Sequence, residues 1–125
     1  MKKRLVTLDL SNNRLTGPIP STVSHLTNLR SLCLNGNQII GFIPEEIGKI
    51  NGFVPLEVGD LKNLIIDLRI SNNHIIGPIP LAMGHLNNLR VLTLDSNQLN
   101  GSIRSELGNM KNLVELVLAN NNLSG

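Results

Sequence analysis

The sequence has almost no aromatic residues and little net charge, and both shortages exclude functions. Among its 125 residues there is no Trp, no Tyr and only two Phe, so it lacks the rings on which nucleic acid bases stack and the aromatic anchors of many protein interfaces. The formal net charge is +2, and the basic cluster at 2–4 is too short to follow a phosphate backbone. Nucleic acid binding is not expected, and any binding surface must be polar or aliphatic.

The chain also lacks long apolar runs. Its 41% hydrophobic and 16% charged residues are typical of one globular domain, 1–125. No stretch reaches the roughly 18 apolar residues that mark a membrane-spanning helix. A basic start is followed by 5–10, which Thr7 and Asp9 interrupt, so no secretory signal is predicted. We therefore expect no signal peptide, no transmembrane segment and no direct insertion of this chain into a membrane.

What the sequence does contain is an internal repeat with a period of about 24 residues. The same frame of leucine, asparagine and glycine returns at this step in both halves of the chain, for example at 8–15 and 92–99. Each of five copies carries two aliphatic residues spaced two apart, so about five strand-bearing repeats are predicted. The asparagines of the frame, which predict a structural ladder, are Asn13, Asn37, Asn73, Asn97 and Asn121.

Each part of the repeat has a physical interpretation. Aliphatic residues two positions apart project from the same face of a short strand, here toward the core. The asparagine follows where the strand turns away, and its amide can donate and accept, so it can satisfy backbone groups of its own coil and of the next. The glycine after it can adopt a backbone conformation that other residues avoid, and the proline that follows fixes φ. Together they favour a short, irregular return path.

Three segments, 17–20, 41–44 and 77–80, complete the repeat with Gly-x-Ile-Pro. The whole pattern, Leu-x-x-Leu-x-Leu-x-x-Asn-x-Leu-x-Gly-x-Ile-Pro, resembles the plant-specific leucine-rich repeat (LRR) family, which includes the ectodomains of receptor-like kinases and receptor-like proteins. The resemblance implies an α/β LRR solenoid, with a short parallel β-sheet on its concave face and irregular turns and 3-10 segments on its convex face. It also implies a location on the extracellular side of the plasma membrane or in the apoplast.

One stretch departs from the repeat. Gly52 follows Gly41 after less than half of the usual step, as though the part of a repeat that carries one strand and one asparagine were missing. We predict a truncated, strandless repeat at about 51–63 that bulges from the convex side, because an ejected loop costs little. The alternative is that the stack breaks here into two smaller pieces.

Capping segments are also absent. The family usually covers its first and last coils with separate segments that contain cysteine pairs, whereas Cys33 is the only cysteine here. Apolar core and strand edges would be exposed at both ends, which leaves self-association through uncapped ends open. The chain therefore looks like an internal fragment of a longer ectodomain, or like a truncated product.

The sequence shows no catalytic or metal-binding motif. It has no phosphate-binding loop, nucleophile elbow or kinase signature. His25 and His85 occupy equivalent convex positions of different repeats and His74 follows a frame asparagine, so they are predicted to be separate surface residues. No enzyme activity, cofactor or metal is expected, and any kinase activity would belong to a parent domain outside this chain.

The predicted binding surface is the outward side of the concave sheet. Its carboxylates outnumber a single arginine, which predicts a mildly acidic groove for a basic or polar extended peptide, although solubility alone also favours short polar residues there. Cys33 is expected to point outward as an unpaired thiol. The candidate ligand-binding residues are Thr7, Asp9, Ser11, Ser31, Cys33, Asn35, Asp67, Arg69, Ser71, Thr93, Asp95, Glu115 and Val117.

Three functions remain open. The favoured one is non-catalytic recognition of a protein or peptide ligand, with a co-receptor as a further partner, by a fragment of a plant LRR receptor-like ectodomain. The second is an enzyme-inhibitor module similar to the polygalacturonase-inhibiting proteins, which would need cysteine caps and more coils. The third is a truncated product without independent function.

Two Asn-x-Ser sequons, at Asn100 and Asn122, are candidate N-glycosylation sites if the chain is exported.

Overall fold

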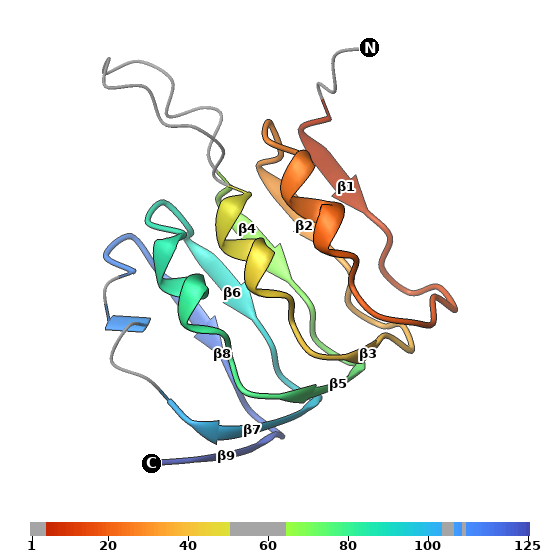
Figure 1. Ribbon diagram of the computed structural model, residues 1–125, viewed down its shortest axis with the longest axis vertical. Coiled ribbons are helices and arrows are strands. Elements are labelled where there is room, and N and C mark those ends of the chain that lie inside the picture. The colour runs from red at the N-terminus through yellow and green to blue at the C-terminus, as the bar shows by residue number, and fades with distance from the viewer. Residues whose placement is uncertain (1–4, 51–64, 104–106, 109) are drawn as a thin grey trace.

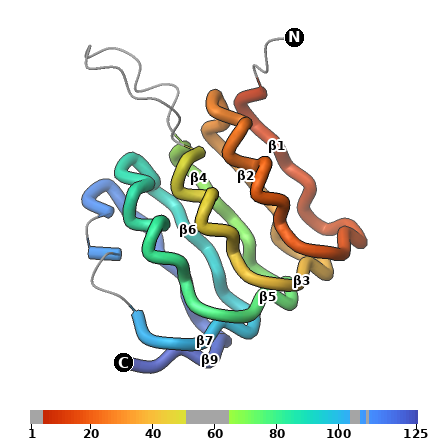
Figure 2. Tube along the Cα trace, viewed as in Figure 1, coloured from red at the N-terminus to blue at the C-terminus, as the bar shows by residue number. Residues whose placement is uncertain are grey.

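The structure, a computed structural model, describes residues 5–50, 65–103, 107–108 and 110–125. These residues wind into coils that stack side by side, and each coil contributes one strand to a common sheet (Figures 1 and 2). All neighbouring strands in this sheet are parallel, as the repeat predicts. In spatial order the strands are β1 (Thr7–Asp9), β2 (Ser31–Cys33), β4 (Asp67–Arg69), β6 (Val91–Thr93) and β8 (Glu115–Val117).

The sheet continues without a break across the interruption in the repeat. Strand β2 pairs directly with β4, with Leu32 opposite Leu68 and Ser31 opposite Asp67. The alternative of two separate pieces is therefore wrong, because the two strands hydrogen-bond in the same register as every other pair in the sheet. The truncated, strandless repeat predicted at 51–63 lies outside the described residues.

The opposite, convex side carries short 3-10 helices: η1 (Ser21–His25), η2 (Glu45–Lys49) and η4 (Leu81–His85) (Figure 1). A proline precedes each of them, with φ of −67 to −70° at the N-cap. Proline has no N–H to donate and fixes φ, so it suits the start of a single helical turn. The prediction of irregular turns with 3-10 segments on the convex face is confirmed.

A second parallel sheet, which the sequence analysis did not predict, lies between the concave strands and the 3-10 helices. Its strands are β3 (Ile40–Gly41), β5 (His74–Gly77), β7 (Gln98–Ser102) and β9 (Asn122–Ser124). They are two to five residues long and end at or near the repeat's glycines, which have φ near +80°. Strands this short show little alternation of polar and apolar residues, so the sequence pattern indicated a turn at these positions.

The core is formed by the aliphatic residues that the repeat places inward. Leu32, Leu68 and Leu92, one from each of three central strands, are at most 1% exposed. At the end of the stack the equivalent residue, Leu116, is 42% exposed. Burial of each leucine thus depends on a neighbouring coil on both sides.

An asparagine ladder holds consecutive coils together. The Asn73 amide nitrogen donates to the carbonyl of Leu34 in the preceding coil at 3.1 Å and to that of Ile70 in its own coil at 3.1 Å. Its carbonyl oxygen accepts from the Ile39 backbone N–H at 3.0 Å. Asn37, Asn97 and Asn121 make the same three kinds of contact, each with the coil before it, whereas Asn13 of the first coil bonds only to carbonyls of its own turn.

The turn that presents each ladder asparagine uses a left-handed backbone conformation. The residues immediately before the ladder asparagines have φ between +56 and +73°, a region that Asn and Gly enter most readily. Ser96 is the one member of this set that is neither Asn nor Gly. These residues are Asn12, Gly36, Asn72, Ser96 and Asn120.

We expect Asn73→Ala to destabilise the domain by about 3 kcal/mol, because it leaves one buried N–H and two buried carbonyls without their partner. Asn13→Ala is the matched control, since Asn13 is exposed and contacts only its own coil, and it should cost less than about 1 kcal/mol. Urea unfolding followed by circular dichroism measures both. Equal losses for the two variants would contradict the role assigned to the ladder.

Candidate ligand-binding face

The strand register arranges the candidate residues in three columns that run across the concave sheet. Hydrogen-bonded neighbours place Thr7, Ser31, Asp67 and Glu115 in the first column, together with Val91, which was not among the candidates. The second column holds Asp9, Cys33, Arg69, Thr93 and Val117. Just beyond the strands, backbone bonds align Ser11, Asn35, Ser71 and Asp95.

Most candidates are exposed or half-buried, as a binding face requires, and Thr93 is the exception. Its residue is only 7% exposed, and its hydroxyl lies 3.3 Å from that of Ser71 on the neighbouring coil. The expectation that Thr93 is an outward contact residue is therefore corrected. The hydroxyl contact with Ser71 links two neighbouring coils.

The carboxylates of the face are partly engaged within it. Asp67 accepts from the guanidinium of Arg69 at 3.0 Å on the same strand. Asp9 accepts from both the hydroxyl and the backbone N–H of Ser11, at 2.6 and 3.0 Å, and these bonds lower the pKa of its carboxyl. Asp67 is therefore charge-paired within the face, whereas Asp9 keeps its negative charge because the hydrogen bonds from Ser11 stabilise the ionised carboxyl.

Cys33 lies near the middle of the second column, between Asp9 and Arg69 of the flanking strands. Partial burial raises the pKa of its thiol, the Ser31 hydroxyl at 3.9 Å acts in the opposite sense, and the charges of Asp67 and Asp9 raise it further. The side chain is half-buried and unpaired. It is thus a neutral thiol on the candidate face.

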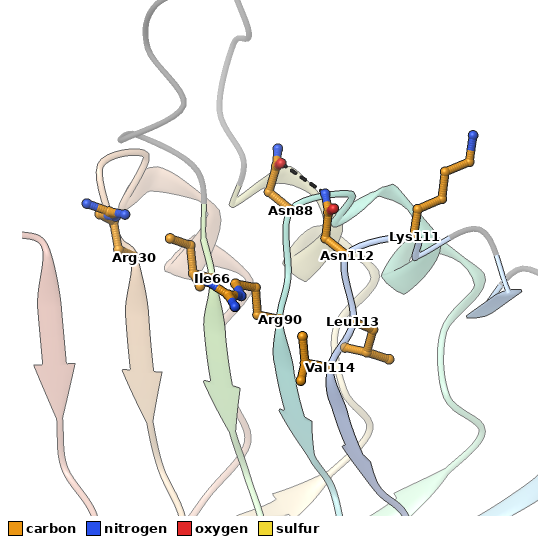
Figure 3. Close-up of a pocket in the computed structure, with 8 residues that line it drawn as sticks. All are labelled: Arg30, Ile66, Asn88, Arg90, Lys111, Asn112, Leu113 and Val114. Atoms are coloured by element: carbon orange, nitrogen blue, oxygen red, sulfur yellow. Dashed lines mark hydrogen bonds between the residues drawn. The ribbon is translucent and has the colours of Figure 1, made fainter.

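A basic pocket that the sequence analysis missed borders the face at the edge where the strands begin (Figure 3). The pocket has a volume of about 730 Å³. Arg30 and Arg90 occupy the same position of two repeats, immediately before β2 and β6, and a comparison of the repeats at that position would have found them. The lining residues are Arg30, Ile66, Asn88, Arg90, Lys111, Asn112, Leu113 and Val114.

The histidines and the sequon asparagines lie away from this face. His25 and His85 end separate 3-10 helices and His74 begins β5. Within the described part of the chain there is no group of three or more His, Cys, Asp or Glu residues that could hold a metal ion. Asn100 and Asn122 are exposed and face each other across β7 and β9 of the second sheet.

Known proteins with this repeat establish the family. Residues 3–47 match the family described as leucine-rich repeats in two copies, and 65–86 and 88–110 match the single leucine-rich repeat. The chain belongs to the leucine-rich repeat family. None of the helices in its described residues is long and apolar enough to cross a membrane.

Curated relatives of this LRR chain are plant receptors. Receptor-like protein 35 of Arabidopsis thaliana is 38% identical over 107 residues, which cover 77% of this chain and 11% of the relative. The LRR receptor-like serine/threonine-protein kinase GSO2 of the same plant is 49% identical over 47 residues, or 37% of this chain and 4% of that protein. The chain therefore spans only about a tenth or less of the length of these relatives.

Solved structures with the same fold are LRR ectodomains of receptor kinases. The Arabidopsis receptor kinase HAESA, in complex with the peptide hormone IDA and the co-receptor SERK1, superimposes with a TM-score of 0.85 at 42% identity over 98% of this chain and 19% of that one. The ectodomain of GASSHO1/SCHENGEN3 from Arabidopsis thaliana, in complex with CASPARIAN STRIP INTEGRITY FACTOR 2, gives 0.84 at 33% identity, covering 97% of this chain and 13% of its own. The LRR solenoid predicted from the repeat is thus confirmed.

We expect the Cys33 thiol of this LRR domain to react slowly with iodoacetamide near neutral pH, because a raised pKa leaves less thiolate, the reactive form. The rate should increase as the pH rises through that elevated pKa, which lies above the pKa of an ordinary thiol. Mass spectrometry of the modified chain measures it. The same chain unfolded in urea is the control, and equal rates for folded and unfolded chain at neutral pH would refute the shift.

Proposed function

We propose that this chain is a recognition module, not a catalyst, which binds a peptide or protein segment along its concave sheet as part of a plant LRR receptor-like ectodomain. The observation that carries the proposal is the unbroken five-strand sheet, whose outward columns contain polar side chains that the core does not use. A regular array of this kind offers contacts at fixed spacing, which suits extended ligands. The work of the module is binding alone.

The known proteins support this proposal. HAESA and GASSHO1/SCHENGEN3 share the fold and were solved with a peptide hormone and with CASPARIAN STRIP INTEGRITY FACTOR 2. The co-receptor SERK1 in one of these complexes supports a second protein partner. GASSHO1/SCHENGEN3 is a plant membrane receptor kinase whose ectodomain has this fold, which supports a place for this chain on the extracellular side of the plasma membrane or in the apoplast. Because this chain matches small fractions of the relatives, its own ligand and partners are proposals.

The dimensions of the sheet bound the ligand. Five parallel strands spaced about 4.8 Å apart span about 19 Å across the concave face. An extended peptide advances about 3.3 Å per residue, so roughly six residues fit along the face. The proposed ligand is therefore a short linear segment.

Neither the inhibitor module nor the inactive product gains a specific supporting observation from the described residues.

We also propose that copies of the chain associate through the ends of the stack. Strands β1 and β8 each pair with one neighbour only, so each leaves a free edge of backbone donors and acceptors among the described residues. The aliphatic side chain of Leu116 at one end is 42% exposed, whereas its equivalent Leu92 is fully buried. Stacking one copy on another would bury the leucine and extend the sheet.

The binding proposal predicts that peptides selected from a random-sequence display library on this chain lose affinity when the concave face is blocked. Ser31→Arg places a long charged side chain on β2, and we expect at least about tenfold weaker binding, because one bulky side chain interrupts the contacts of an extended ligand. Fluorescence anisotropy of the labelled peptides gives the Kd. Thr22→Arg on the exposed convex helix η1 is the matched control. Equal effects of the two substitutions would overturn a concave site.

The self-association proposal predicts a sedimentation coefficient that rises with protein concentration. Leu116→Lys should suppress the rise, because a charge at the exposed end cannot be buried against a second copy. Ile40→Lys on the second sheet replaces a residue that is also about half exposed, 51%, and should leave the rise intact. A monomer at every concentration, or equal loss in both variants, would refute association through the ends.

A further inference from the structure

We propose that the basic pocket at the strand-entry edge binds the acidic side chains of a peptide ligand, with Arg30 and Arg90 as the two principal contacts. This inference rests on the proposed function, since it names the chemistry that one edge of the same peptide-binding face would recognise. Three cationic residues, Arg30, Arg90 and Lys111, line the pocket, and no Asp or Glu of the described residues does.

The backbone fixes the relative positions of the two arginines. The Ile66 N–H donates to the carbonyl of Arg30 at 2.9 Å, and the Arg90 N–H donates to that of Ile66 at 2.7 Å. Arg30, Ile66 and Arg90 therefore form a column just ahead of three adjacent strands, and the arginines are two strand spacings, roughly 10 Å, apart at the backbone. In Figure 3 the Arg90 side chain extends toward Ile66, so the aliphatic residue lies between the two guanidinium groups.

The guanidinium groups are available to a ligand. The ion pair recorded among the described residues joins Arg69 to Asp67, and neither Arg30 nor Arg90 has a carboxylate within 4 Å in that part of the chain. Arg90 is exposed and Arg30 is half-buried. Each planar guanidinium can hold a carboxylate through two parallel hydrogen bonds. Ile66, which is half-buried, and Val114, which is 74% exposed, place apolar side chains between and beside them, against which the aliphatic part of an acidic side chain can pack.

The rim of the pocket is polar and held in place. The Asn112 amide nitrogen donates to the Asn87 carbonyl at 3.0 Å and to the side-chain oxygen of Asn88 at 3.3 Å (Figure 3). These bonds lock two neighbouring loops together, so the pocket does not need to be ordered by its ligand. Lys111 extends from the same rim and adds a third positive charge.

The composition of the pocket favours an acidic peptide over other anions. Nucleic acid binding without aromatic rings would require a longer track of cations, and the described lining contains no aromatic residue. A chain terminus supplies one carboxylate, whereas three cations match several acidic side chains. The pocket runs beside the adjoining concave face over four of its five coils, so acidic side chains along one side of a segment of about six residues would reach it.

The test is the binding of a fluorescein-labelled hexaglutamate peptide with an amidated C-terminus, measured by fluorescence anisotropy at low salt. We expect the pair Arg30→Ala and Arg90→Ala to weaken binding by about tenfold or more. The pair Arg14→Ala and Lys49→Ala removes the same charge from exposed residues outside the pocket and should change the Kd by less than about twofold. Similar losses for both pairs would show diffuse attraction and overturn the site.

Further arms test the chemistry itself. Arg90→Lys keeps the charge and most of the aliphatic stem, so it also tests the site if the alanine pair unfolds. It should bind more weakly than the original chain because a lysine cannot form the paired bonds. Unchanged affinity would overturn the assignment. A hexaserine peptide with a free C-terminus that binds as tightly, or an oligothymidine that binds more tightly, would overturn the choice of acidic side chains.

The two proposals fail separately. If hexaglutamate binding does not depend on Arg30 and Arg90 while library peptides remain sensitive to Ser31→Arg, the pocket is not an acidic-peptide site and the concave face still binds. If hexaglutamate depends on the arginines and no library peptide responds to Ser31→Arg, the pocket stands and the proposed concave site fails.

Discussion

The asparagine ladder is the interaction on which the rest of this structure depends. A single coil cannot pair its own backbone, because its short strand, its turn and its return path point in different directions. The ladder asparagine solves this for the turn by donating to carbonyls of two consecutive coils and accepting an N–H from the preceding one. Without it, each buried turn would carry unpaired polar groups whose cost is comparable to a large part of a small domain's stability.

Because the ladder fixes the offset between coils, it also fixes which side chains become neighbours on the concave face. Residues from successive coils, far apart in the sequence, are opposite each other in the sheet, as Thr7, Ser31 and Asp67 show. The additional residues between β2 and β4 do not change the register, since the ladder contact of Asn73 with Leu34 forms as it does between evenly spaced coils. A repeat protein can thus vary a coil's length and still present an ordered surface.

The sequence alone was sufficient to predict the part of the fold that the 24-residue repeat controls. The five strands and the inward leucines follow from residue types at fixed spacing, and the 3-10 segments were implied by the resemblance to the LRR family. The second sheet did not, because β3 contains only two residues and its partners come from other coils. The exposure of single residues was also beyond the pattern: Thr93 has the same repeat position as Cys33, yet Thr93 is buried and Cys33 is half-buried.

The electrostatic character of the face shows why counting charges along the strands is insufficient. The carboxylate of Asp67 is compensated by Arg69 at 3.0 Å on its own strand, whereas that of Asp9 accepts hydrogen bonds from the uncharged Ser11 and keeps its charge. Arg30 and Arg90, which have no carboxylate within 4 Å among the described residues, precede the strands and so fall outside a count limited to strand residues. Stacking brings them into one pocket although they lie in opposite halves of the sequence. A positive edge beside a sheet that carries the carboxylates of Asp9, Asp95 and Glu115 gives the surface two sides of opposite charge, so an extended ligand with acidic side chains along one side would be oriented as well as attracted.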